Sequence, residues 1–291
     1  MKRYALSHRT RYQYSQPVSL SRHLLHLSPR PVPHQACRRH QLKISPPPSI
    51  TSDGTDFFGN PIRYATFQDN HSRIDILAES LIDVQSRPTL DVNSTTPWED
   101  VPQMIAGDLS IEGLGISQFC YASRMTIADT NLVADITRFF TPGRPVLEAA
   151  MDLMGHIFAT YEYDGTATTV STPVDEVIRI KRGVCQDFAH LQIACLRALG
   201  LAARYVSGYL LTHPPEGQEK LVGADASHAW LSLWVPEYGW VDLDPTNNII
   251  PGDEHITLAW GRDYADVSPI NGVIFGGGQH TVHVEVDVNP T

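Results

Sequence analysis

The chain has 291 residues, 42% of them hydrophobic, and 22 Lys and Arg against 32 Asp and Glu give a formal net charge of −10. This length suits two modest domains, and the negative charge argues against a general nucleic-acid-binding or anionic-membrane-binding surface. The sequence has no apolar stretch of about 18 residues, so we expect no membrane span. We recognise no secretory signal, and the four cysteines form no dense disulfide framework, so we expect reduced thiols in a cytoplasmic protein.

Residues 1–95 are expected to form an antiparallel, sandwich-like β domain. Segments rich in β-forming residues, separated by turn-forming Pro, Gly, Asn and Asp, lie at 4–14, 20–28, 41–45, 62–67 and 73–84. Pro17 separates the first two. His34, Cys37 and His40 have the spacing of metal ligands, but a structural zinc site needs a fourth ligand. We therefore predict a solvated loop that leads into a strand.

Residues 96–144 are predicted to be a partly helical connector, with one helix over 128–140. Residues 145–291 are predicted to form a second domain that opens with an amphipathic helix over 145–160. A turn is expected at 214–217. The alternation over 281–288 predicts a strand that closes the sheet of this domain or lines the interface between domains.

Cys185 stands where a helix of the second domain is expected to begin. Gly183 permits a tight turn before it, apolar residues follow at helical spacing, and Gly200 is a suitable stop. The unpaired N–H groups and the positive end of the helix dipole favour a thiolate at such a position. A thiolate is a nucleophile, and it requires a base and a group that orients the base.

A base and an orienting acid follow on two strands that are expected to pair. Residues 225–235 alternate and carry His228, and after a short turn a second strand ends at Asp244. Alternation places Asp242 and Asp244 on the same face, so both carboxylates are candidates for orienting the imidazole.

The motifs around these positions resemble the bacterial transglutaminase-like superfamily. They lie within about residues 145–250 and begin at Gly183, Ala203, His228 and Gly239. The resemblance implies a papain-like core with a Cys-His-Asp triad, in which Cys185 is the nucleophile, His228 the base and Asp244 the acid. Asp244 is chosen because the family's acid directly precedes a Pro-Thr or Ala-Thr pair. Residues 1–95 also resemble the N-terminal region of one bacterial branch of the family.

Acyl transfer requires hydrogen-bond donors for an oxyanion. The backbone N–H of Cys185 is one, and Tyr161 or Tyr163 is the candidate second donor, with packing as core aromatics as the alternative. Gln186 is expected either to contact substrate or to lie on the helix surface. Trp230 is expected either to line the cleft or to pack in the core.

Asp187 is expected to accept an N–H group at the start of the helix or to pair with Arg204. His190 lies five residues after Cys185 and does not share its helix face, so we reject it as the base. The chain has no Asp-rich calcium-binding loop, and we predict neither a metal requirement nor a cofactor.

The sequence thus predicts an α+β protein whose catalytic core follows an all-β domain. The expected function is thiol-dependent acyl transfer on an amide or isopeptide bond, with hydrolysis by a cysteine peptidase or amidase as the leading reading. An amine acceptor would make the chain a transglutaminase or amide ligase instead. A non-catalytic peptide-binding module is the alternative of another class. The expected partner is a peptide or amide substrate, and no oligomeric state is assigned.

Overall fold

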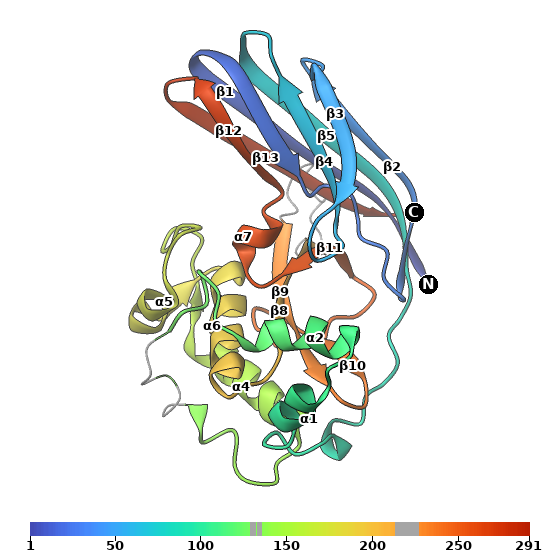
Figure 1. The fold of residues 1–291 in the computed structure, drawn as a ribbon, viewed down its shortest axis with the longest axis vertical. Helices are drawn as coiled ribbons and strands as arrows, with labels where there is room; N and C mark the ends of the chain where they lie inside the picture. Colours follow the sequence, from blue (N-terminus) through green and yellow to red (C-terminus); the bar gives the residue numbers. More distant parts are fainter. Residues whose placement is uncertain (129–131, 133–135, 213–226) are drawn as a thin grey trace, which may run out of the picture.

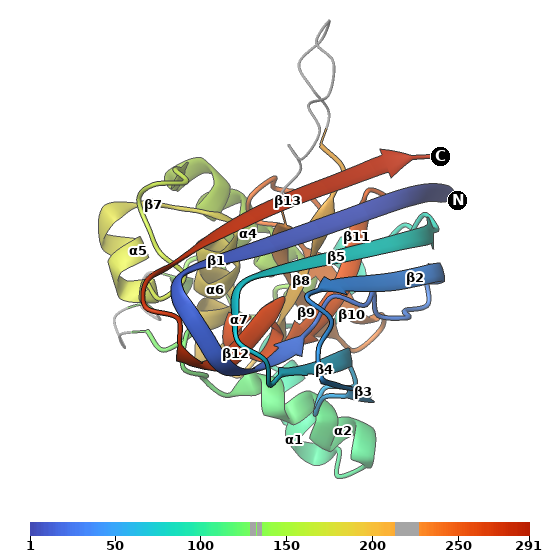
Figure 2. The ribbon, with the colours of Figure 1, turned by 90° about the horizontal axis from the view of Figure 1, so that it is seen from above.

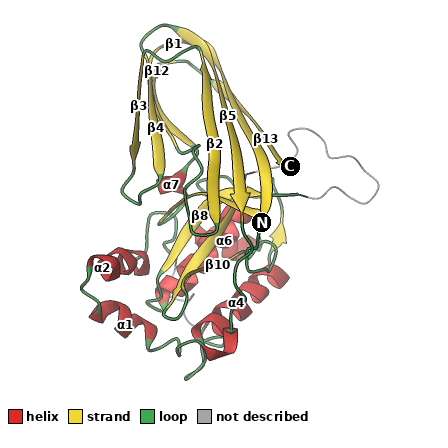
Figure 3. Cartoon of the chain, turned by 90° about the vertical axis from the view of Figure 1, so that its right-hand side faces the viewer, coloured by secondary structure: helices red, strands yellow, loops and turns green. Residues whose placement is uncertain are grey.

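The computed structural model describes residues 1–128, 132, 136–212 and 227–291. A β region lies above a mixed α+β region (Figure 1). The N-terminal part of the chain supplies the strands β1 (Lys2–Leu25), β2 (Gln35–Ser45), β3 (Ile50–Thr55), β4 (Pro61–Phe67) and β5 (His71–Val84). They pair in antiparallel fashion in the order β2-β5-β1-β4-β3 within one seven-stranded sheet, whose long adjacent strands are seen in Figure 3. The expected antiparallel N-terminal β region is therefore present.

Strand β1 continues through Pro17, where the sequence predicts a boundary between two strands. The pairing with β5 runs up to Gln13 and then skips to Val18, and the pairing with β4 begins at Ser21. The carbonyl oxygen of Pro17 accepts a hydrogen bond from the N–H of Gly277 at 3.2 Å. A proline is tolerated at such an irregularity because its missing N–H removes no ladder bond there. The two expected segments are thus one bent strand, whose bend is visible in Figure 2.

The last two strands, β12 (Ile270–Gly276) and β13 (His280–Pro290), both pair with β1. The segment 281–288 therefore completes the sheet of the β region, so its expected place in the sheet of the second domain is wrong. The alternative place, at the interface between the domains, is confirmed, because Val286 and Val288 pack in one buried cluster with residues of the second sheet. Alternation predicts a strand but does not identify its partner, which here lies at the opposite end of the chain. This pairing brings the two termini to the same side of the molecule (Figure 1).

The rest of the chain forms short helices and a second sheet. The helical elements are η1 (Val92–Ser94), α1 (Val101–Gly107), α2 (Ile111–Ser117), η2 (Gln118–Cys120), α4 (Val146–Thr160), α5 (Val174–Ile180), α6 (Cys185–Ala198) and α7 (Tyr264–Val267). The strands are β6 (Glu162–Tyr163), β7 (Arg182–Gly183), β8 (Ala203–Leu210), β9 (Ser227–Val235), β10 (Gly239–Leu243) and β11 (His255–Gly261). The larger sheet has the antiparallel order β10-β9-β8-β11.

This four-stranded sheet is covered on both faces. Helix α6 packs with Leu231 and Leu233 of β9 in the largest apolar core. On the other face, Tyr209 and Ile256 share a second core with residues of the β region such as Tyr4. The two regions are therefore joined by a buried apolar interface, which supports α6 and the sheet as a rigid platform.

Some expected features fall outside the described residues or differ from the prediction. Of the helix expected over 128–140, residues 129–131 and 133–135 lie outside them, while 132 and 136 are helical and 137–139 form a turn, so the helix ends before 140. The turn at 214–217 lies entirely outside them. Strand β2 begins at Gln35, so the stretch expected as a loop around Cys37 is mainly strand. The ring of His40 is hydrogen-bonded to the hydroxyls of Ser28 and Ser80 at 3.0 and 2.9 Å. Within the described part of the chain, every helix is too short or too polar to cross a membrane.

Candidate active site

Cys185 is the first residue of α6, as the spacing predicts, and its side chain is half-buried. The carboxylate of Asp187 caps this helix, because its Oδ2 accepts the N–H of Val184 at 2.9 Å and the hydroxyl of Thr168 at 2.6 Å. Of the two roles expected for Asp187, the structure therefore shows the capping role. Arg204, the other expected partner, stacks on two tryptophan rings instead.

Gly183 is required by this cap rather than by a tight turn. A Cβ atom at this position would lie 2.7 Å from Oδ2 and 2.9 Å from Cβ of Asp187. The backbone of Gly183 also pairs in parallel with Tyr163, so β6 lies directly beside the start of α6. Among the described residues, the N–H groups of Cys185 and Gln186 have no hydrogen-bond acceptor, as is typical of the first turn of a helix.

His228 connects the Cys185 thiol with a buried carboxylate. It lies near the start of β9, opposite Gly208 of β8. Its Nε2 donates to Oδ2 of Asp244 at 2.8 Å, and its ring is also hydrogen-bonded to Cys185. Because Nε2 is engaged by the carboxylate, Nδ1 is the nitrogen left for the sulfur. Asp244 is fully buried and follows β10, where it forms an isolated bridge with Ile249.

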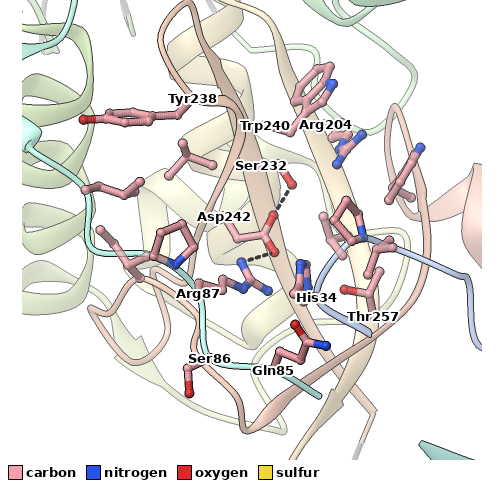
Figure 4. Close-up of a pocket in the computed structure, with 18 residues that line it drawn as sticks. His34, Gln85, Ser86, Arg87, Arg204, Ser232, Tyr238, Trp240, Asp242 and Thr257 are labelled. Carbon is pink, nitrogen blue, oxygen red and sulfur yellow. Dashed lines mark hydrogen bonds and ion pairs between the residues drawn. The ribbon is translucent and has the colours of Figure 1, made fainter. Parts of the chain in front are cut away.

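Alternation made Asp242 and Asp244 equal candidates for orienting the imidazole of His228, and the structure distinguishes them. Asp242 pairs with Ser232 across the β9-β10 ladder and accepts its hydroxyl hydrogen bond. Its other oxygen accepts Nη1 of Arg87 at 2.7 Å (Figure 4). Ser232 is four residues beyond His228 on β9, a span of about 13 Å. Asp242 therefore belongs to a different polar cluster from the one around His228.

The charges of this cluster support one another. Burial alone disfavours the imidazolium, but hydrogen bonds and charges from Asp244 and Cys185 outweigh burial and raise the pKa of His228 to about 10. Burial disfavours the ionised form of Asp244 too, yet its bonds to His228 and His255 hold the pKa of this carboxyl well below its usual range. The arrangement thus favours a charged His228 next to an ionised Asp244 at neutral pH.

Two further residues hold Asp244, and neither is among the residues predicted from the sequence. His255, at the start of β11, is buried, and its Nε2 donates to Oδ2 of Asp244 at 3.1 Å. The side-chain amide of Asn247 donates to the same oxygen at 2.7 Å. Asn247 stands three residues after Asp244, which is a local signal, whereas His255 reaches the site through sheet packing alone.

Among the described residues, one group has potential metal-ligand atoms that all lie within 4.8 Å of one another. It consists of His228, Asp244 and His255. Both imidazole Nε2 atoms face the same carboxylate oxygen at hydrogen-bonding distance. Each Nε2 must therefore carry a proton to make its hydrogen bond, and a metal would have to displace both protons. The donor geometry fits a hydrogen-bonded cluster.

The remaining candidate residues have distinct surroundings. Tyr163 is 60% exposed beside Cys185, while Tyr161 is half-buried, and both rings lie near Phe188. Gln186 is buried and donates to the carbonyl oxygen of Val170 at 3.1 Å, so its expected place on the helix surface is wrong.

Trp230 and His190 are both structural. Trp230 is 0% exposed and packs edge-to-face on His255, with ring centroids 5.2 Å apart, so the core alternative for Trp230 holds and the cleft-wall alternative does not. His190 is buried, stacks near Tyr205 and accepts the N–H of Tyr264 at 3.1 Å. Its rejection as the base agrees with this position.

Two family descriptions match separate parts of the chain. Residues 4–83 match the Bacterial transglutaminase-like N-terminal region, and residues 131–245 match the Transglutaminase-like superfamily. The second match contains Cys185, His228 and Asp244.

Individual proteins extend this similarity. An uncharacterized protein from Mycobacterium bovis is 40% identical over 300 residues, which cover 99% of this chain and 93% of that protein. A protein-glutamine gamma-glutamyltransferase from Pseudomonas aeruginosa is 32% identical over 138 residues, which cover 45% of this chain and 20% of that protein. The solved structure of a putative cysteine protease from Cytophaga hutchinsonii has the same fold, with a TM-score of 0.78 at 21% identity over 99% of this chain and 90% of that one. The chain belongs to the transglutaminase-like superfamily.

Proposed function

We propose that the chain is a cysteine peptidase or amidase that hydrolyses an amide or isopeptide bond through a thioester at Cys185. Superfamily membership supports thiol-dependent acyl transfer as the broader class. The observation that carries the proposal is the placement of His228, which bonds to the Cys185 thiol on one side and to buried Asp244 at 2.8 Å on the other. Nucleophile, base and orienting acid are thus contiguous.

In the first step, the Cys185 sulfur attacks the carbonyl carbon of the substrate amide. The negative charge that develops on the carbonyl oxygen needs donors. The start of α6 orients the N–H groups of Cys185 and Gln186, which have no acceptor in the part of the chain that the structure describes. The exposed Tyr163 hydroxyl beside Cys185 is our candidate for an additional donor. The Gln186 side chain does not serve here, since it is bonded to Val170.

In the second step, the carbon–nitrogen bond breaks, and His228 gives its proton to the leaving amine. The product is a thioester between the substrate acyl group and Cys185. Neutral His228 then takes a proton from water as the water adds to the thioester carbonyl. The carbon–sulfur bond breaks, the carboxylic acid leaves, and the thiolate–imidazolium pair is restored beside Asp244.

A glutamyl transferase is the second candidate, because a relative that matches part of the chain carries that name. Both reactions form the same thioester and differ only in whether water or an amine resolves it. The peptide or amide substrate and the cytoplasmic location are part of the proposal. Vestigial peptide binding is disfavoured because all three residues are present and in contact.

The test is product analysis on a glutamine-containing peptide and on a set of peptides and γ-glutamyl isopeptides, with and without a fluorescent primary amine. Cys185-dependent cleavage or ammonia release without added amine supports hydrolysis. Amine incorporation that exceeds hydrolysis supports the transferase. Cys185→Ala is the control for both. If neither product forms, and the Cys185 thiol is no more reactive than an ordinary exposed thiol, the enzymatic proposal is overturned.

A further inference from the structure

A cavity of about 640 Å³ lies between the β region and the sheet that carries His228 (Figure 4). Its walls come from the segment before β2, the segment after β5 and the strands β8 to β11. Gln85, Ser86 and Pro88 are exposed and form its mouth. Ligand sites of small molecules commonly have this size and lie at such interfaces. The cavity is separate from the Cys185 site, because Ser232 in its wall is about 13 Å along β9 from His228.

Arg204 is a buried cation in the wall of this cavity. It is only 8% exposed, and its guanidinium carbon lies 4.3 Å from the ring centroid of Trp240 and 3.7 Å from that of Trp260. Its Nε is buried without a hydrogen-bond partner among the described residues, and no carboxylate of that part of the chain lies within ion-pair distance of it. Burial lowers the pKa of Arg204 to about 9, and the nearby charge of Asp242 offsets only part of this effect.

Arg87 and His34 present further donors to the same cavity. Arg87 uses Nη1 for Asp242 at 2.7 Å, while its Nε and Nη2 are buried and have no partner in the described ranges. Nε2 of His34 is likewise buried and unbonded within those ranges, and it donates in the tautomer that carries its proton on this nitrogen. Unsatisfied buried donors are costly, so a cavity that contains three such groups is suited to an acceptor supplied by a ligand.

The charge balance selects the kind of acceptor. The charged residues in the walls are Arg87, Arg204 and Asp242, and the pair between Arg87 and Asp242 leaves one positive charge. His34 adds none at neutral pH, because burial and the nearby Arg87 lower its pKa to about 4. One positive charge matches a monoanion better than a phosphate dianion. A guanidinium also binds a carboxylate with the geometry of two parallel hydrogen bonds.

The remaining walls indicate the rest of the ligand. Apolar side chains from both regions line the cavity, including Val32, Leu90, Val206, Val241 and Ile250. We propose that this cavity binds an organic carboxylate with an apolar body, with the carboxylate held by Arg204 and by the free donors of Arg87 and His34. The site is independent of the triad, so its test does not depend on the proposed reaction.

The experiment is isothermal titration calorimetry of the full chain with benzoate, 4-phenylbutyrate and octanoate, each compared with its neutral primary amide and with inorganic phosphate. We expect at least one carboxylate to bind with a Kd below about 5 mM, and its amide to bind at least about tenfold more weakly. Equal binding of acid and amide, binding of phosphate alone, or no binding of any carboxylate would overturn the proposal.

Variants locate the site. Arg204→Met and Arg87→Met are each expected to weaken carboxylate binding by at least about tenfold. Arg179→Met removes the same charge from exposed helix α5, outside the cavity, and is expected to leave the Kd unchanged. If Arg204→Met fails to fold, Arg204→Lys and Arg87→Met decide the outcome. The proposed site is contradicted if Arg204→Lys and Arg87→Met both bind the carboxylate with wild-type affinity. It is also contradicted if Arg179→Met loses as much affinity as the variants in the cavity.

Discussion

The substitution Asp244→Asn removes the charge that holds His228 while keeping the size of the side chain. Asp244 is fully buried and accepts Nε2 of His228 at 2.8 Å. A hydrogen bond to a charged group contributes about 1.5–3 kcal/mol, which corresponds to about a 10- to 100-fold change in population. We therefore expect the imidazolium–thiolate pair of His228 and Cys185 to be depleted by that factor at neutral pH.

Alkylation by iodoacetamide, read by peptide mass spectrometry as a function of pH, measures this population because the thiolate is the reacting form. Cys185 is expected to react fastest of the four cysteines near neutral pH. Burial raises the pKa of Cys37 above its usual value and that of Cys120 to about 11, and Cys195 is buried. In Asp244→Asn, the rate at Cys185 is expected to fall by about 10- to 100-fold at neutral pH.

Asp242→Asn is the comparison that separates the carboxylate within β10 from Asp244, which directly follows β10. This residue is buried like Asp244, but it bonds to Ser232 and Arg87 and not to His228. Its substitution is expected to lower stability and to retain the pH profile of Cys185 alkylation. An unchanged alkylation rate in Asp244→Asn, or a larger loss in Asp242→Asn, would refute the reasoning.

Three further outcomes are expected. Since the pKa of His228 rises from 6.5 to about 10 on folding, its stabilising effect is complete below pH 6.5 and is lost toward pH 10. The free energy of unfolding in urea should thus fall more steeply across this window in the wild type than in His228→Ala, and parallel curves would contradict this. Gly183→Ala places a Cβ 2.7 Å from Oδ2 of Asp187 and should cost about 1–3 kcal/mol in the same assay, with slower Cys185 alkylation; wild-type values would show that the cap is not the reason for glycine. His255→Leu removes a donor to Asp244 and should slow Cys185 alkylation by about tenfold, and an unaltered rate would assign His255 to packing alone.

Local patterns were sufficient to predict the elements that carry the candidate triad. Helical spacing places Cys185 at the start of α6, and alternation places His228 on a strand next to the strand of Asp242. These predictions succeed because each depends on residues within about one helix or one hairpin. The choice of Asp244 rested on the resemblance, and the structure places Asp244 against His228.

Other features follow only from contacts between distant segments. Alternation predicts that residues 281–288 form a strand, but the pairing of this strand with β1, and not with a strand of the β8 sheet, follows from contacts between distant segments. His255 reaches Asp244, and Arg87 reaches Asp242, through the packing of strands and linkers that no periodicity relates. A repeat of two or 3.6 residues reports which face of an element is buried, and it carries no information about which distant element covers that face.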